Sequence, residues 1–119
     1  MPAPPSSEPL AAQSKATAYD LALAVNPSLV VVRISTYGQF GKPEYLGRPG
    51  YDAIAQAYGG MMHVTGDPSG PPQRAMVYTG DYISALTGWG AAMMALWEVK
   101  KTGRGQVVDL AQFEAVAET

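Results

Sequence analysis

The sequence contains no cysteine and only one histidine, His63. Without cysteine there is no disulfide framework, no thiolate nucleophile and no cysteine-based zinc site. A single imidazole cannot build a multi-histidine metal site either, so we expect His63 to be a satisfied or solvated side chain without a catalytic role. Thiol chemistry and zinc chemistry are both excluded.

Charge is also scarce, because charged residues make up only 15% of the 119 residues and the net charge is -2. The eight Lys and Arg side chains give no basic field that could hold a phosphate backbone, so we expect no nucleic-acid partner. The most apolar stretch, residues 83–99, is interrupted by polar residues and falls short of a membrane span. No secretory signal opens the chain, which predicts a cytoplasmic protein.

Hydrophobic residues make up 47% of the chain, which is enough for one domain with a buried core. Residues 1–16 carry several prolines and no apolar period, which predicts a disordered Pro/Ala/Ser-rich tail, with the folded part over residues 17–119. There we expect a short helix at 17–25 and a strand at 29–34. The unbroken β-branched run LVVVRI is typical of a strand buried on both faces of a parallel sheet.

Two further helices are predicted from apolar periodicity, over residues 51–62 and 82–101. The expected apolar face of the first is Ile54, Ala57, Tyr58 and Met61. The second is the strongest helix of the chain, and we expect it to be buried. Its expected apolar face is Leu86, Trp89, Ala92, Met93, Leu96 and Trp97.

The segment 100–103, Lys-Lys-Thr-Gly, has the features of a helix end. The lysines complement the negative end of the helix, and the glycine supplies a left-handed C-cap. A short strand is expected over residues 106–108, and Asp109 with Gln112 resembles a capping box that opens a last helix. Helices that alternate with buried strands predict the α/β class, with parallel strands and flanking helices.

Asp81 stands between Gly80 and the long predicted helix, so we expect its carboxylate beside the positive helix terminus. An aspartate at such a junction usually caps the helix, which is a structural role. Alternatively, it is a nucleophile or base that faces a pocket, with the preceding glycine allowing a substrate to approach the backbone closely. Composition alone leaves both roles open.

Residues 35–50 form a predicted surface loop with four glycines and two prolines around three aromatic side chains. The glycine spacing matches neither a dinucleotide-binding motif nor a phosphate-binding Walker loop. The aromatic residues Tyr37, Phe40 and Tyr45 could line an apolar mouth, although aromatic side chains in such a loop more often anchor it to the core.

Four separated segments resemble the family III CoA-transferases in their order and spacing. They are AVNPSLVVVRISTYGQFG, RPGYDAIAQAYGGMM with VTGDPSGPP, YTGDY, and KKTGRGQVVDLAQFEAV. Within this family, which includes formyl-CoA transferases, GQFGKPEYL and MVYTGDYISALT look most like the carnitine CoA-transferase branch. The resemblance covers residues 17–119 and implies part of a Rossmann-like large domain.

The resemblance implies that Asp81 is a nucleophile that takes CoA from an acyl-CoA as an aspartyl thioester and passes it to a small carboxylic acid. Tyr37 and Gly38 would lie where the active-site loop of the family approaches the thiol end of CoA. Coenzyme A is a substrate in this chemistry, and no metal or other cofactor is required. Family members are several times longer and form interlocked dimers, so we expect this chain to be an internal fragment of a homodimeric enzyme.

A different reaction is expected if the chain resembles the α-methylacyl-CoA racemase type. Enzymes of that type use the corresponding aspartate as a proton shuttle and place a histidine where this chain has Tyr51. A phenol exchanges α-protons poorly compared with imidazole, which favours CoA transfer. The sequence also leaves open a truncated chain without activity, or a module that binds acyl-CoA without turnover.

Overall fold

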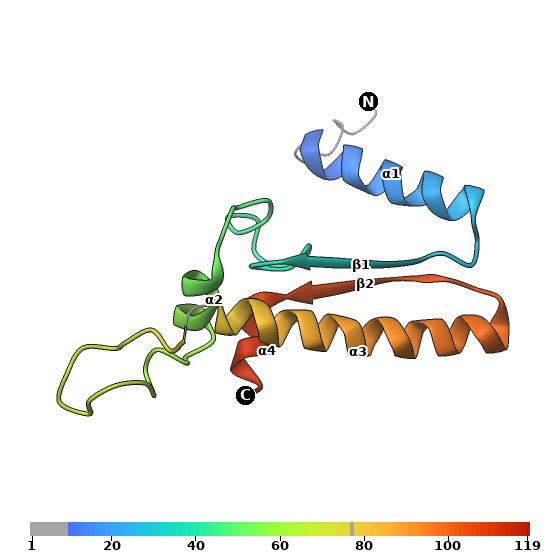
Figure 1. Cartoon of the computed structure of the whole chain (residues 1–119). Coiled ribbons are helices and arrows are strands. Elements are labelled where there is room, and N and C mark those ends of the chain that lie inside the picture. Colours follow the sequence, from blue (N-terminus) through green and yellow to red (C-terminus); the bar gives the residue numbers. More distant parts are fainter. Residues whose placement is uncertain (1–9, 77) are drawn as a thin grey trace.

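The computed structural model describes residues 10–76 and 78–119, with side chains from residue 18 onward (Figure 1). Its elements are α1 (Leu10–Val25), β1 (Val30–Ser35), α2 (Asp52–Tyr58), α3 (Thr79–Thr102), β2 (Gln106–Ala111) and α4 (Gln112–Ala117). The strands β1 and β2 pair in parallel, in a register from Val30 opposite Gln106 to Ser35 opposite Ala111. The connection between them contains α2 and α3, as parallel pairing requires a crossover. The expected α/β class with parallel strands and flanking helices is confirmed.

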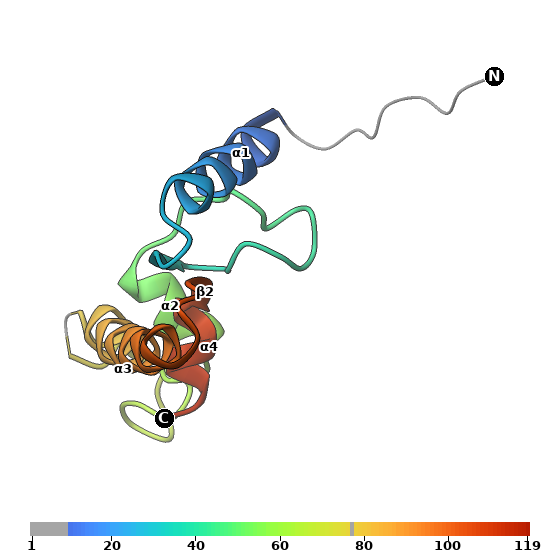
Figure 2. The ribbon, with the colours of Figure 1, turned by 90° about the vertical axis from the view of Figure 1, so that its right-hand side faces the viewer.

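The two faces of the sheet are covered differently, with α3 on one face and α1 opposite it (Figure 2). Gly88 lets α3 approach closely, because a Cβ atom there would lie 3.1 Å from Ile34 Cδ1. On the other face, the Arg33 guanidinium lies 4.4 Å from the centroid of the Tyr19 ring in α1. β1 is only partly buried, and Ile34 is 46% exposed. The prediction that this strand is buried on both faces is therefore wrong, because β1 and β2 alone form the described sheet.

The first helix begins at Leu10 and not at residue 17. Its first residues, Leu-Ala-Ala-Gln-Ser-Lys-Ala, include strong helix formers and no proline, and this outweighs the missing apolar period. The tail predicted over residues 1–16 is therefore wrong from Leu10 onward. Residues 1–9 lie outside the described part of the chain.

α2 is shorter than predicted and buries a different face. It ends at Tyr58 because two glycines follow. Ile54 and Tyr58, on the predicted apolar face, are 38% and 51% exposed. The polar residues Asp52 and Gln56 are buried instead, because this side of α2 faces the polar N-terminal end of α3.

α3 begins at Thr79, a little before the predicted start, and Gly103 closes it in the left-handed conformation at φ 72°. The predicted C-cap is thereby confirmed. The buried side of α3 carries only small residues, because large side chains would hold it away from the strands. They are Gly80, Ser84, Gly88 and Ala95.

The predicted apolar face of α3 is largely exposed, so the expectation of a buried helix is wrong for this face. The exposed fractions are 70% for Leu86, 67% for Trp89, 50% for Met93, 49% for Leu96 and 59% for Trp97. Periodicity identified the apolar side of the helix, but the sheet packs against the small side chains. Within the described residues, no helix has the length and apolar character needed to cross a membrane.

β2 continues to Ala111, well beyond the strand predicted over residues 106–108. Asp109 therefore lies within the strand, opposite Arg33, and its Oδ2 accepts a hydrogen bond from the Gln39 amide at 2.8 Å. α4 begins at Gln112 without a side-chain cap. The predicted capping box is wrong, because strand pairing holds Asp109 in the sheet, where it binds the loop after β1.

The buried core lies where α2, α3 and α4 meet, below the ends of the two strands. Its apolar members are small: Ala55, Ala111, Ala115 and Val116, while Ala95 is buried farther along α3. Close packing here depends on Gly59, where a Cβ atom would lie 2.7 Å from Val116 Cγ1. The same junction buries the polar side chains Thr36, Asp52, Gln56 and Ser84. This arrangement brings α2 against the first turn of α3.

Candidate active site

Asp81 lies in the first turn of α3, close to the point where both parallel strands end (Figure 1). The carboxyl edge of parallel strands is the usual place for ligands in open α/β sheets. A pocket of about 240 Å³ opens here. It is lined by Gly50, Tyr51, Asp52, Ala53, Arg74, Tyr78, Asp81 and Gln112.

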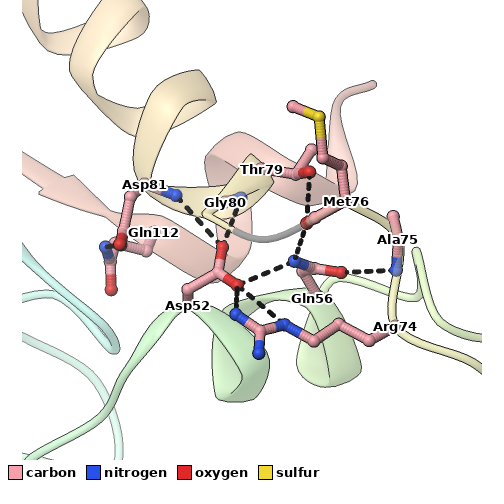
Figure 3. Close-up of polar contacts among 9 residues, drawn as sticks. All are labelled: Asp52, Gln56, Arg74, Ala75, Met76, Thr79, Gly80, Asp81 and Gln112. Atoms are coloured by element: carbon pink, nitrogen blue, oxygen red, sulfur yellow. Dashed lines mark hydrogen bonds and ion pairs between the residues drawn. The ribbon is translucent and has the colours of Figure 1, made fainter.

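The first turn of α3 is capped by Asp52 from α2, and not by Asp81 (Figure 3). Asp52 Oδ1 accepts a hydrogen bond from the Gly80 amide at 2.7 Å and a longer one from the Asp81 amide at 3.4 Å. The residue at the N-cap position, Tyr78, makes no side-chain cap. The structural role considered for Asp81 is therefore filled by another carboxylate.

The Asp81 carboxylate is held from the other side of the pocket. Gln112 Nε2 donates to Asp81 Oδ1 at 2.7 Å, and Thr36 Oγ1 at the end of β1 donates to Gln112 Oε1 at 3.1 Å. These contacts join the ends of both strands to the first turn of α3. No other hydrogen bond to the Asp81 carboxylate is found among the described residues, and Asp81 lines the pocket.

Asp52 is 4% exposed and is surrounded by donors. Its Oδ2 accepts hydrogen bonds from Gln56 Nε2 at 2.8 Å and from Arg74 Nε and Nη2 at 3.1 and 2.5 Å. Burial alone would raise the pKa of Asp52, but the hydrogen bonds from Arg74, Gln56 and the amides of α3 together hold that pKa below its ordinary value. Asp52 is therefore ionised at neutral pH, in an ion pair with a half-exposed Arg74 side chain.

Tyr78 precedes α3 in a conformation that is rare for a bulky residue. Its φ of 63° and ψ of 19° lie in the left-handed region, and its side chain lines the pocket of Asp81. Strained backbone of this kind costs about 1–3 kcal/mol and concentrates at functional sites. This turn directs the chain into α3 immediately before Gly80 and Asp81.

Tyr37 and Gly38 lie beside this pocket but do not line it. Tyr37 packs in an aromatic cluster, with ring centroids 5.2 Å from Tyr45, 5.4 Å from Tyr58 and 6.4 Å from Phe113. Gly38 has a φ of 78°, and a Cβ atom there would lie 3.7 Å from Asp109 Oδ2. Near these two residues, Thr36 of the same loop is linked to Asp81 through hydrogen bonds with Gln112.

The aromatic cluster anchors the loop after β1, as expected for two of its three aromatic side chains. Tyr58 Oη donates to Tyr45 Oη at 2.8 Å, and this hydrogen bond raises the pKa of Tyr58. Phe40 does not take part and is 76% exposed. The loop is thus fixed at Tyr37 and Tyr45, with Phe40 projecting outward.

Sequence reasoning missed Asp52 and Arg74 and assigned Gln112 to a different task. Asp52 has the sequence signature of any acidic residue in the first turn of a helix. Its contacts with Arg74 and Gly80 join residues 22 and 28 positions apart, so no local pattern could reveal them. Only the adjacency of Asp52 to Tyr51, in the motif RPGYD, gave a signal that this position lies near the site.

A second hollow, of about 340 Å³, lies in the loop 63–72 and shares no residue with the pocket of Asp81. His63 lines this hollow, away from the polar contacts described above. No group of three or more potential metal-ligating side chains occurs within residues 10–76 and 78–119. The chemistry-bearing side chains therefore concentrate at the first turn of α3.

Comparison with known proteins identifies the family. The family model described as CoA-transferase family III matches residues 6–119, so the match also includes part of the predicted tail. An L-carnitine CoA-transferase of Proteus mirabilis is 41% identical over 91 residues, which cover 76% of this chain and 22% of the relative.

Solved structures agree with this assignment. A CaiB/BaiF family protein from Brucella suis has a TM-score of 0.79 at 35% identity, over 85% of this chain and 26% of that protein. A hypothetical protein from Mycobacterium tuberculosis has a TM-score of 0.72 at 29% identity, over 83% of this chain and 28% of that protein. The chain spans roughly a quarter of the length of these relatives. A match to the family model over nearly the whole chain, a similar curated relative and a shared fold place this chain in CoA-transferase family III.

Proposed function

We propose that this chain carries the nucleophilic centre of a CoA-transferase that moves CoA between carboxylic acids, with Asp81 as the nucleophile. The observation that carries the proposal is the state of the Asp81 carboxylate. It faces a pocket at a helix N-terminus, and Asp52 performs the capping task that would otherwise engage it. The family of the chain supports the same chemistry.

Attack on a thioester by a carboxylate needs position, partial desolvation and donors for the oxyanion that develops. Gln112 holds Oδ1 of Asp81, so Oδ2 is the oxygen presented to a substrate. The N-terminus of α3 favours negative charge at this place, which stabilises the carboxylate between turnovers. The arrangement thus supplies a fixed anionic nucleophile without a metal ion.

In the proposed reaction, Asp81 Oδ2 attacks the thioester carbonyl carbon, the C–S bond breaks and CoA leaves as the thiolate. The thiolate then attacks the aspartyl carbonyl of the resulting anhydride, which releases the donor acid and forms an aspartyl-CoA thioester. The acceptor carboxylate attacks this thioester and displaces CoA again. In the last step the thiolate attacks the acceptor carbonyl, which yields the new acyl-CoA and restores the Asp81 carboxylate.

The substrates that we propose are acyl-CoA and small carboxylic acids, with no cofactor other than CoA as substrate. L-carnitine is the substrate named for the Proteus mirabilis relative, and we extend it to this chain as the first acid to test. We further propose that Tyr37 and Gly38 contact the thiol end of CoA, since their loop follows β1 beside the pocket. A homodimer in the cytoplasm is the proposed state of the full-length enzyme.

The experiment incubates the purified chain with L-carnitinyl-CoA or butyryl-CoA and a second carboxylic acid, and follows acyl-CoA products and the intact protein mass. We expect the wild-type chain to gain the mass of bound CoA, and hydroxylamine to release it. Asp81→Asn should show neither the adduct nor transfer. Asp67→Asn, in the distant loop 63–72, is the matched control and should behave as the wild type.

Four outcomes would contradict the proposal. Undiminished transfer by Asp81→Asn would show that Asp81 is not the nucleophile. A wild-type chain that neither transfers CoA nor forms an adduct would show that the proposed activity is absent. Exchange of the α-proton of an acyl-CoA with deuterated solvent, without a CoA adduct, would instead indicate the racemase type. Binding of acyl-CoA without an adduct or proton exchange would indicate a binding module.

A further inference from the structure

Two carboxylates meet at the N-terminus of α3, and only one of them is saturated with hydrogen bonds (Figure 3). Asp52 accepts from two backbone amides, from the Gln56 amide group and from two nitrogens of Arg74. An ionised carboxylate has about four lone-pair positions. Asp52 therefore has no free oxygen to offer a substrate and cannot serve as a second nucleophile or base.

The backbone amides that donate hydrogen bonds to Asp52 are amides that would otherwise attract the Asp81 carboxylate. An acidic side chain in the first turn of a helix is attracted to the amides at the helix start, which carry partial positive charge. Here the amides of Gly80 and Asp81 are already bound. The Asp81 carboxylate instead accepts a hydrogen bond from Gln112, the first residue of α4.

Close packing makes this contact specific. A Cβ atom on Gly80 would lie 3.2 Å from Asp52 Oδ1 and 3.4 Å from Ala55 Cβ, both tighter than or at the limit of ordinary contact. A side chain at position 80 would therefore press on the Asp52 carboxylate and displace it by a few tenths of an ångström from the helix amides.

The other oxygen of Asp52 ties α2 to the segment that leads into α3. Arg74 begins this segment, and Gln56 accepts a hydrogen bond from the Ala75 amide at 3.0 Å and donates one to the Met76 carbonyl at 3.2 Å. Because Asp52 and Gln56 are also hydrogen-bonded to each other, one polar cluster fixes both the segment before α3 and its first amides.

We propose that Asp52 is a positioning residue for Asp81: held by Arg74 and Gln56, it binds the first amides of α3 and thereby keeps the Asp81 carboxylate free for substrate. This inference rests on the proposed role of Asp81 as the nucleophile. It assigns Asp52 no contact with substrate, and it predicts that loss of Asp52 changes the rate of the chemical step more than the binding of acyl-CoA.

The test combines amide hydrogen exchange, measured by NMR on the whole chain, with CoA transfer by the same samples. In Asp52→Ala we expect exchange at Gly80 and Asp81 to rise by about tenfold or more, since a hydrogen bond to a charged group is lost. We expect kcat to fall by about 100-fold through misplacement of Asp81, with KM for acyl-CoA changed by less than about threefold. In Asp52→Asn the side-chain oxygen can still accept the Gly80 amide, so this variant should recover part of both losses.

Gly80→Ala tests the same contact from the helix side and decides the matter if Asp52→Ala does not fold. It should raise exchange at the Asp81 amide and lower kcat while Asp52 itself is unchanged. Asp67→Asn is again the control for removal of a carboxylate elsewhere.

The readouts separate the two proposals. If Asp81→Asn transfers CoA as the wild type does, the proposed nucleophile is wrong, while amide exchange still decides whether Asp52 holds the first turn of α3. If Asp81→Asn is inactive but Asp52→Ala or Gly80→Ala keeps the wild-type kcat, the positioning role is overturned. Unchanged exchange at Gly80 and Asp81 in Asp52→Ala would overturn it as well.

Discussion

At its C-terminal end α3 is closed by residues that follow it directly in the chain, whereas its N-terminal end is closed by a carboxylate from α2. Gly103 adopts a left-handed conformation and donates to the Val99 carbonyl at 2.7 Å, with two lysines in the last turn. At the other end, Asp52 reaches the Gly80 amide across 28 positions of sequence. The local closure only ends a helix, whereas the distant closure also prepares a candidate catalytic side chain beside it.

The largest expected effect comes from removing the distant closure. Asp52→Ala leaves Arg74, Gln56 and two helix amides without their common acceptor, and we expect the free energy of unfolding to fall by about 3 kcal/mol. Urea titration followed by far-UV circular dichroism measures this loss. Asp67→Ala, which removes an acceptor only from its own turn with Ser69, should stay within about 0.5 kcal/mol of the wild type. A loss below about 1 kcal/mol for Asp52→Ala would show that the distant cap stabilises the chain no more than an ordinary local cap does.

Acidification should remove the same closure without a mutation. The folded-state pKa of Asp52 lies below its ordinary value, so its contribution to stability is complete above the unfolded-state pKa of about 3.9 and is lost as pH falls through the folded-state pKa. The difference in unfolding free energy between the wild type and Asp52→Asn should be constant above about pH 5 and shrink below about pH 4. Urea titrations at several pH values measure it. A difference that grows on acidification would contradict the assignment.

The local closure of α3 by Gly103 should contribute less to the free energy of unfolding than Asp52 does. Gly103→Ala places a Cβ atom at a φ of 72°, and we expect a loss of about 1 kcal/mol in the free energy of unfolding. Gly90, inside the same helix, has open space around it and no positive φ. Gly90→Ala is the matched control and should increase stability by about 0.8 kcal/mol, through helix propensity. The two substitutions are chemically identical, so the same sign for both would refute the left-handed C-cap as the cause.

The smallest effect on stability is expected at Asp81, where the effect on activity should be largest. Because Asp52 caps the helix, Asp81→Ala loses only a favourable charge near the helix start and the contact with Gln112, which together amount to about 0.5 kcal/mol. CoA transfer should disappear. A stability loss as large as that of Asp52→Ala would mean that Asp81 caps α3 after all.

Much of the fold could be predicted because local residues determine it. The β-branched run gave β1 to within one residue at each end, and Gly103 marked the end of α3. Which face of each helix or strand is buried could not be predicted in the same way. Apolar periodicity identified Trp89 and Trp97 as one face of α3, but the sheet packs on the opposite, small-residue side.

The candidate site was predictable in one part and hidden in another. Asp81 was a candidate because a carboxylate that follows a glycine at a helix start fits either a cap or a nucleophile, and the resemblance of YTGDY favoured the nucleophile. The spacing of Asp109 to Gln112 predicts a cap, but strand pairing holds Asp109 opposite Arg33 in the sheet. Asp52 was hidden because its partners are brought to it only by the tertiary fold.

The sequence separation of these contacts also bears on the order in which the molecule is built. The hydrogen bonds that Asp52 and Asp81 make to Arg74 and Gln112 join residues 22 and 31 positions apart, and the bond from Thr36 to Gln112 spans 76 positions. α3, by contrast, is held along its length by bonds between near neighbours. Closing long loops is costly in entropy, and parallel strand pairing is correspondingly slow. We therefore expect the helix to form early and the pocket at its N-terminus to be among the last parts of the chain to assemble.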